Sequence, residues 1–168
     1  MKILILLISA MLFSCTQKSN NLLSKEQTKK IQEDVQAVIA QISDAAAHVD
    51  TTKLYDVFSF EGDDFTYMET TGAFYDQNAY KQMVRQFYGP LKSEIIEKGA
   101  EKYSYLSEDN VLWSYSGAIT ATYKNGQQTI YKPFGMTMLF RKTNKKWKVV
   151  LLQESTQEPA QADKTKLN

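Results

Sequence analysis

The sequence predicts an α+β domain in which three N-terminal helices pack on a curved, mostly antiparallel sheet. Three observations support this fold class. Apolar residues recur at helical spacing over residues 25–58, strand-like runs rich in aromatic and β-branched residues follow residue 100, and turn residues separate those runs. Helices that precede a run of strands are typical of α+β folds, and 168 residues fit about one domain.

The first two predicted helices are defined by their capping residues. Ser24, with Gln27 three residues later, forms a capping-box pattern before a long amphipathic stretch. The apolar spacing then predicts one helix over residues 25–49. Asp50 follows as the expected N-cap of a short helix over residues 51–58.

A third helix is predicted to begin at Asp76 or Asn78 and to carry Tyr80, Met83, Val84 and Phe87 on its inner face. Pro90 interrupts this helix because proline has no backbone N–H to donate. The helical pattern is expected to resume from Leu91 to Gly99.

The predicted strands begin with residues 65–70, where alternation places Phe65, Tyr67 and Glu69 on one face. Asn125-Gly126 lies between two later strand patterns and indicates a two-residue hairpin turn. A second tight turn is expected at residues 142–145. The four later strands are predicted over residues 102–107, 111–123, 127–142 and 146–155.

The N-terminus has the pattern of a secretory signal. Lys2 precedes a short apolar run that is too short to span a bilayer, and the run ends at Ser14-Cys15. The segment Leu12-Phe13-Ser14-Cys15 resembles the lipobox of bacterial lipoproteins, which implies lipidation of Cys15 and anchoring in the cell envelope, in the periplasm or at the outer membrane. An ordinary signal peptide with a coincidental cysteine is the alternative.

These features divide the chain into four parts. Residues 1–14 are the predicted lipoprotein signal peptide, and residues 15–24 are a polar tether. Residues 25–156 form the folded domain. Residues 157–168 contain Pro159 and few apolar side chains, which predicts a flexible tail.

Composition excludes several classes of function. With 20 Lys+Arg against 19 Asp+Glu, the chain has a net charge of only +1, which argues against a broad surface for binding nucleic acid. One Cys and one His exclude an intramolecular disulfide and a Cys- or His-rich metal site, so no metal is expected. Because no P-loop or dinucleotide-binding glycine pattern is present, no cofactor is expected either.

The order of elements and several segments resemble the nuclear transport factor 2-like superfamily, particularly its SnoaL-like branch. The segments that carry this resemblance are TTKLYDVFS, DFTYMETTG, NAYKQMVRQFY and GMTMLFRKTNKKWKVVLLQES. The resemblance implies a cone-like fold with a ligand pocket at its open end, and often a homodimer. Members of the superfamily include enzymes and non-catalytic binding modules, so the fold alone does not define the function.

The resemblance also implies candidate catalytic positions. Isomerases of this superfamily use a carboxylate base on the first strand, with a Tyr and a protonated Asp as oxyanion donors. Glu69 lies at the carboxylate position, where an apolar pocket would raise the pKa of a general base. Ile42 and Met136 fall near the two donor positions, which disfavours isomerase chemistry.

A set of aromatic, methionine and polar side chains on alternating strand positions is expected to line the pocket. Aromatic walls with a few polar groups are typical of small-molecule sites. Core packing or a dimer interface is the alternative for each of them. The set consists of Phe65, Tyr67, Trp113, Tyr115, Met136, Met138 and Gln153.

Two further features have structural explanations. His48 ends the long helix, where an imidazolium interacts favourably with the helix dipole. The basic run from Arg141 to Lys148 fits a solvated hairpin that discourages edge pairing, and contact with anionic lipid is the alternative.

Three hypotheses of function follow. The first is a membrane-anchored lipoprotein that binds a small molecule or peptide without catalysis. The second is a lyase, isomerase or hydrolase with Glu69 as general base. The third is a homodimeric assembly module that uses the open face of the sheet.

Overall fold

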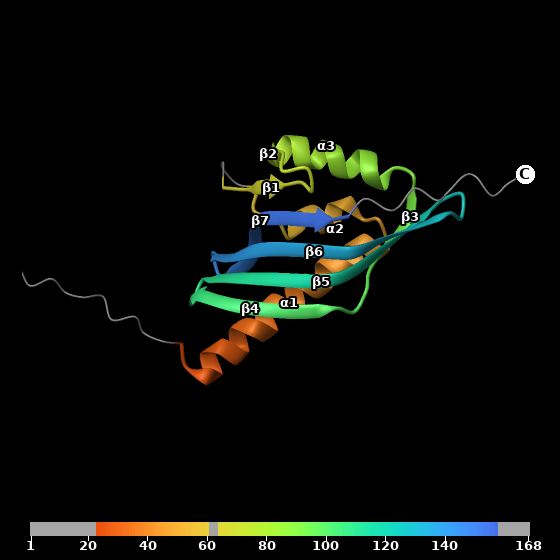
Figure 1. Ribbon diagram of the computed structural model, residues 1–168. Coiled ribbons are helices and arrows are strands. Elements are labelled where there is room, and N and C mark those ends of the chain that lie inside the picture. The colour runs from red at the N-terminus through yellow and green to blue at the C-terminus, as the bar shows by residue number, and fades with distance from the viewer. Residues whose placement is uncertain (1–22, 61–63, 158–168) are drawn as a thin grey trace, which may run out of the picture.

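The computed structural model describes residues 23–60 and 64–157 and has the α+β architecture that the sequence predicts (Figure 1). The helices are α1 (Lys25–Ala47), α2 (Thr51–Asp56) and α3 (Gln77–Tyr88). The strands are β1 (Thr66–Met68), β2 (Phe74–Tyr75), β3 (Leu91–Ile96), β4 (Ala100–Ser107), β5 (Asn110–Tyr123), β6 (Gln128–Thr143) and β7 (Lys146–Thr156).

Several sequence predictions lie outside the described residues. These are the signal peptide, the lipidation site at Cys15, the tether up to residue 22 and the tail from residue 158. In the described part of the chain, no helix has the length and apolarity needed to cross a bilayer.

The strands form one curved sheet in the order β2-β1-β7-β6-β5-β3, with β4 also paired to β5. The long β5 serves two partners, because its first half pairs with β4 and its second half pairs with β3. All neighbours are antiparallel except β1 and β7, which run parallel. Helix α1 passes behind the sheet, and α3 lies beyond its β1 edge (Figure 1).

The helices form where the capping residues predict them. The Ser24 side chain accepts a hydrogen bond from Gln27 N, and the Gln27 side chain accepts one from Ser24 N, which completes the capping box of α1. Asp50 caps α2 by accepting from Lys53 N. Asp76, rather than Asn78, caps α3 by accepting from two backbone N–H groups.

Two sequence predictions about the fold are wrong. The turn between β5 and β6 is not the two-residue turn expected at Asn125-Gly126, because Tyr123 N donates to Gln127 O across a loop of residues 124–126, in which only Gly126 adopts a positive φ. Residues 91–99 do not resume a helix, because Leu91–Ile96 forms the edge strand β3. The β5–β6 hairpin extends past the sheet and presents an open edge of β5, and residues 91–96 pair with it antiparallel. The gain of these backbone hydrogen bonds outweighs a helical apolar spacing in so short a segment.

A bulge in β7 determines which of its side chains face the helices. Val149 is opposite Phe140 and Leu151 is opposite Leu139, so Val150 is an extra residue on the β7 side. Val149 and Val150 are consequently both buried, and the alternation shifts by one residue. Beyond the bulge, Leu152 and Glu154 face the helices.

Candidate functional site

A cavity of about 270 Å³ lies between α3 and the sheet. We call it the first cavity. Its helical wall is one face of α3, where Tyr80, Val84 and Tyr88 recur at four-residue intervals and Met83 and Phe87 lie beside them. Leu54 of α2 contributes to the same lining. The amphipathic pattern of α3 therefore builds an apolar, aromatic wall for the cavity.

The sheet side of the first cavity carries three carboxylates. Glu154 projects from β7, Glu94 projects from β3, and Glu69 follows the end of β1. Tyr131 and Phe134 of β6 complete the aromatic surroundings. None of the described residues that line this cavity is Lys, Arg or His.

Glu154 is the most strongly perturbed acid of this site. The Tyr67 hydroxyl donates a hydrogen bond to Glu154 Oε2 at 2.8 Å. The pKa of Glu154 is raised to about 7. Burial is the main cause, the Tyr67 hydrogen bond opposes it, and the nearby charges of Glu94 and Glu69 add to the rise. Burial and the same carboxylate raise the pKa of Tyr67, so its hydroxyl keeps its proton.

Glu94 of β3 has a similar arrangement. The Tyr88 hydroxyl donates to Glu94 Oε2 at 2.8 Å. Burial raises the pKa of Glu94, while the hydrogen bond from Tyr88 opposes that shift. Each half-buried carboxylate thus has one tyrosine donor. No described residue donates to the Oε1 atom of either one, and neither atom is sealed from solvent.

Glu69 lies beside these two groups and has different partners. Its Oε2 atom accepts from the Tyr75 hydroxyl at 3.0 Å and from Thr71 Oγ1 at 3.1 Å. The turn after β1 makes this possible, since Gly72 adopts φ +85° and brings β2 back alongside β1. The predicted general base therefore lines the first cavity together with Glu94 and Glu154, whose pKa values are raised by burial.

A second cavity of similar volume, about 270 Å³, lies between α1 and the sheet. It is lined by Trp113, Tyr115, Met136 and Met138, four of the residues that the sequence predicts for the pocket. All four are at most 5% exposed. The sequence-predicted pocket residues are therefore divided between two cavities.

Two aromatic side chains of the second cavity, Tyr115 and Trp113, have their polar atoms paired within the protein. The Tyr115 hydroxyl lies 2.7 Å from Glu97 O and 2.9 Å from Ala118 O, which share its one proton, and it accepts from Ala118 N. Gly99 and Gly117 allow this close approach, because a Cβ atom at either position would collide with the Tyr115 side chain. Trp113 Nε1 donates to Glu101 at 3.2 Å.

Two other predicted pocket residues line neither cavity. Phe65 packs in the core against Phe58, Phe60 and Tyr80, with ring centroids 5.0 to 5.3 Å away. Gln153 lies on β7 next to Glu154, so its side chain points to the opposite face of the sheet. The half-exposed Gln153 pairs there in register with Thr137 of β6.

Sequence reasoning missed Glu94 and Glu154. Glu94 was hidden because its segment has the spacing of a helix. Glu154 follows Val150 and Leu152 on alternating positions, so a carboxylate that continues a buried apolar row was the available signal. An unbroken alternation from Trp147 selects Gln153 instead.

The positions that the isomerase comparison singled out do not share one cavity. Glu69 lines the first cavity, whereas Ile42 and Met136 line the second. Ile42 and Met136 are apolar and buried. The structure therefore places no hydrogen-bond donor from these two positions beside Glu69.

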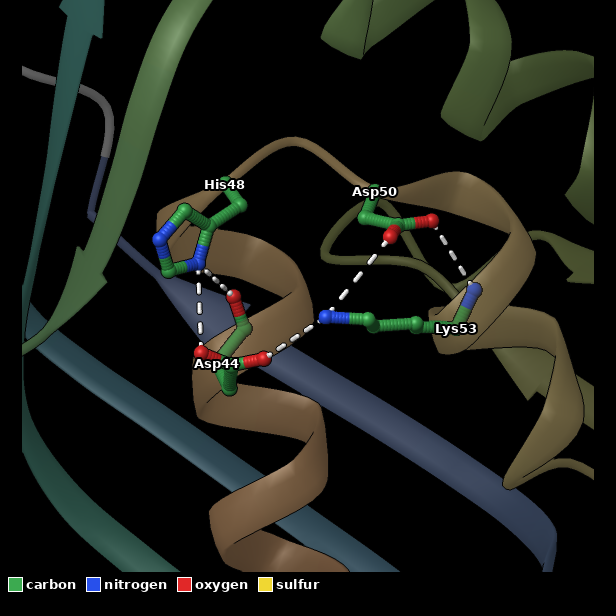
Figure 2. A network of polar contacts seen from close by, with 4 residues as sticks. All are labelled: Asp44, His48, Asp50 and Lys53. Atoms are coloured by element: carbon green, nitrogen blue, oxygen red, sulfur yellow. Dashed lines mark hydrogen bonds and ion pairs between the residues drawn. The ribbon is translucent and has the colours of Figure 1, made fainter.

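His48 belongs to a separate network on the surface (Figure 2). His48 caps the C-terminal end of α1. Its Nδ1 atom lies 2.8 Å from the backbone oxygen of Asp44 and 3.2 Å from Asp44 Oδ1. Lys53 joins the network through Asp44 and Asp50. Exposed ion pairs of this kind contribute little to stability. The network connects the end of α1 with the start of α2.

The first cavity has the features of a small-molecule site. It combines apolar and aromatic walls with a few polar groups, and its acids have raised pKa values. A carboxyl group with a pKa of about 7 can accept or donate a proton near neutrality. Within the described ranges, no three His, Cys, Asp or Glu side chains come together as a metal site.

Comparison with solved structures places the domain in a class of known fold. A candidate scytalone dehydratase from Novosphingobium aromaticivorans DSM 12444 matches with a TM-score of 0.70 and 11% identity, over 80% of this chain and 89% of that chain. A type 3 hexachlorocyclohexane dehydrochlorinase from Novosphingobium barchaimii LL02 matches with a TM-score of 0.65 and 12% identity, over 79% and 90%.

A nuclear transport factor 2-like protein of unknown function from Prochlorococcus sp. NATL2A matches with a TM-score of 0.57 and 22% identity, over 77% of this chain and 94% of that chain. At these identities the likeness shows the fold alone, which is the nuclear transport factor 2-like fold. The family model described as a SnoaL-like domain matches residues 35–159, and the chain therefore belongs to the SnoaL-like domain family. No curated protein matches it significantly.

Proposed function

We propose that this SnoaL-like domain binds a small molecule in the first cavity and that Cys15 anchors it in the bacterial cell envelope. The observation that carries the binding function is the apolar cavity of about 270 Å³ with two incompletely paired carboxylates. Enclosed apolar volume stabilises a ligand by removing its surface from water, and the few polar groups orient it.

A substitution that fills the cavity tests this proposal. Met83 is half-buried and lines the first cavity, so Met83→Trp replaces ligand volume with an indole ring. Gln86→Trp adds the same ring on the exposed side of α3 and is the matched control. We expect native mass spectrometry of the protein isolated from cells to detect a bound molecule that Met83→Trp loses and Gln86→Trp retains. Equal occupancy in both variants would contradict the assignment.

The described residues nearest the tether support the anchoring proposal. Gln27 Nε2, in the first turn of α1, donates to Glu108 in the β4–β5 turn, and Lys142 N donates to Asp109 O in the same turn. The exposed lysines of the β6–β7 turn therefore lie at the end of the sheet next to the start of α1, the helix that follows the tether. Anionic lipid head groups beside the anchor would attract them, with about 1 kcal/mol per lysine.

Fractionation tests the anchor directly. We expect Cys15→Ser to move the protein from the membrane pellet to the soluble fraction, because two acyl chains are needed for stable attachment. Lys145→Glu with Lys146→Glu should weaken the residual binding to anionic vesicles only. A Cys15→Ser protein that still sediments with membranes would refute lipidation as the anchor.

The raised pKa of Glu154 favours a second function, proton transfer in a lyase or isomerase. Two structural neighbours are described as a dehydratase and a dehydrochlorinase. In this proposal Glu154 removes a proton from a substrate that packs against the aromatic wall. The hydrogen bond from the Tyr67 hydroxyl orients the carboxylate. The sequence-based proposal assigns the same role to Glu69, and the two are separable.

The base can be identified with 5-nitrobenzisoxazole, whose ring opening needs only a positioned base. If Glu154 is the base, the rate rises as pH increases through about 7, and Glu154→Gln lowers it by at least about 100-fold. Glu69→Gln should then retain the activity. The reverse pattern would assign the role to Glu69. An unchanged rate in both variants would show that neither carboxylate is the base.

The homodimer remains a separate proposal. Leu106 is 62% exposed and Ile130 is 56% exposed, so apolar surface is available on β4 and β6. Sedimentation velocity across a hundredfold range of concentration tests it, and a constant monomer would contradict it.

A further inference from the structure

The first cavity contains an imbalance of charge that its walls do not correct. Glu94 and Glu154 line it together with Glu69, and none of the described residues lining it is basic. The nearest lysine and arginine of α3 are engaged elsewhere. Lys81 lies 4.1 Å from the Phe60 ring centroid, and Arg85 Nε donates to the Lys81 backbone oxygen. The carboxylates thus lack a cationic partner from the residues around them.

This imbalance has a physical cost that a ligand can remove. A carboxylate in apolar surroundings is unstable as an anion unless a proton or a cation neutralises it. The tyrosine donors supply one hydrogen bond to each of Glu94 and Glu154 and leave each Oε1 atom open. An ammonium group has the positive charge and the hydrogen-bond donors that these atoms lack.

The opposite wall suits the remainder of such a ligand. Tyr80, Phe87 and Tyr88 of α3 present aromatic rings to the cavity, and Met83 adds a polarisable side chain. Aromatic rings attract organic cations through their negative faces, and they also bury apolar groups. The wall therefore matches an apolar or aromatic body attached to the cationic group.

We propose that the first cavity binds an organic amine in its ammonium form, with the charged nitrogen between Glu94 and Glu154 and an apolar body against α3. This inference rests on the proposed small-molecule function and specifies its ligand class. The carboxylates determine the sign of the ligand charge, and the α3 wall determines the apolar character of the rest.

The binding should depend on pH in a defined direction. Glu154 has a raised pKa of about 7, so it is largely protonated below neutrality and gains its charge above it. Amine affinity therefore rises with pH through this range, and binding releases a proton. The titratable groups that face Glu154 from neighbouring elements are Tyr67 and Glu69 at β1, Tyr80 and Tyr88 on α3, Glu94 on β3 and Tyr131 on β6.

Three probes with the same phenylethyl group test the ligand class: 2-phenylethylamine, 2-phenylethanol and 3-phenylpropanoate. Isothermal titration calorimetry of the purified protein at pH 8 should show the amine binding at least tenfold more tightly than the alcohol, and the carboxylate binding most weakly. At pH 5.5 the preference for the amine over the alcohol should shrink. This comparison needs no variant and is unaffected by any folding defect.

Variants then assign the effect to residues. Glu94→Gln with Glu154→Gln should reduce amine affinity to that of the alcohol. Glu97→Gln is the matched control, because Glu97 follows the same strand but lines the second cavity and accepts from Thr120 Oγ1. It should leave the preference unchanged.

The possible failures are distinguishable. If the alcohol or the carboxylate binds as tightly as the amine at pH 8, the amine class is wrong and the small-molecule function stands. If none of the three probes binds at either pH, the amine proposal fails together with the first cavity as a site for such molecules. An amine preference that survives the double Gln variant would overturn the role of Glu94 and Glu154.

Discussion

The two cavities on the helix-covered side of the sheet have similar volumes but differ in how their polar groups are paired. In the second cavity, the Tyr115 hydroxyl makes three backbone contacts and Trp113 Nε1 is paired with Glu101. In the first, Glu94 and Glu154 each keep one oxygen without a protein donor. We propose that these open carboxylate oxygens, rather than volume or aromatic content, distinguish the ligand-binding cavity from the other one.

The largest expected effect is on the free energy of unfolding and comes from the buried carboxylate of Glu154 in the first cavity. The pKa of Glu154 is about 7 in the folded protein and 4.5 for an ordinary glutamate, so the folded protein holds this proton more tightly than the unfolded chain. The stabilisation of the folded protein by this bound proton is complete below about pH 4.5 and is lost as pH rises through 7. Such a difference corresponds to about 3 kcal/mol.

Glu154→Gln should therefore leave stability nearly unchanged at pH 4.5 and increase it by up to about 3 kcal/mol at pH 8.5. Glutamine still accepts the Tyr67 hydrogen bond but carries no charge to be desolvated. Urea unfolding at the two pH values measures this, with Glu97→Gln as the control. If the variant is equally destabilised at both pH values, burial of the ionised carboxylate does not destabilise the folded protein.

The second cavity should respond in the opposite way. Tyr115→Phe removes a hydroxyl that satisfies three backbone groups, so we expect a loss of about 2 kcal/mol in unfolding free energy. Tyr67→Phe removes one bond and should cost less, while it raises the pKa of Glu154 further. Urea unfolding at pH 7 compares the two. A neutral Tyr115→Phe variant would remove the distinction between the cavities.

The smallest effect concerns the helix that forms the wall of the first cavity. Asp76→Ala removes the N-cap of α3, which should cost about 1 kcal/mol and increase hydrogen exchange in its first turn. Asp76→Asn keeps the acceptor oxygen and is the matched variant. Exchange rates that are equal in the two variants would argue against a contribution of the cap to the order of this wall.

The same contrast explains what the sequence can predict. Ser24, Asp50 and Asp76 cap their helices through neighbouring backbone groups, and Asn125-Gly126 turns the chain locally, so these signals are readable without tertiary structure. The strand at residues 91–96 is different, because its pairing partner is distant in sequence. Local spacing favours a helix there, and long-range pairing overrides it.

A long-range effect of the same kind obscures the acids of the first cavity in the sequence. The bulge at Val149 and Val150 shifts the alternation of β7, and a shift of one residue exchanges the two faces of a strand. It places Glu154 in the first cavity and Gln153 on the other face. Tyr67 on β1 and Glu69 just after it are not displaced by such a bulge; the sequence predicts both as site residues, and both line the first cavity.

The most direct test of the first cavity as the ligand site uses the methionine side chains as reporters. Met83 lines the first cavity, whereas Met136 and Met138 line the second. The protein can be labelled with ¹³C-methyl methionine, assigned by Met→Leu substitutions and titrated with 2-phenylethylamine at pH 8. We predict a saturable shift of the Met83 methyl signal while Met136 and Met138 stay in place. A shift of Met136 and Met138 with an unchanged Met83 would contradict the account.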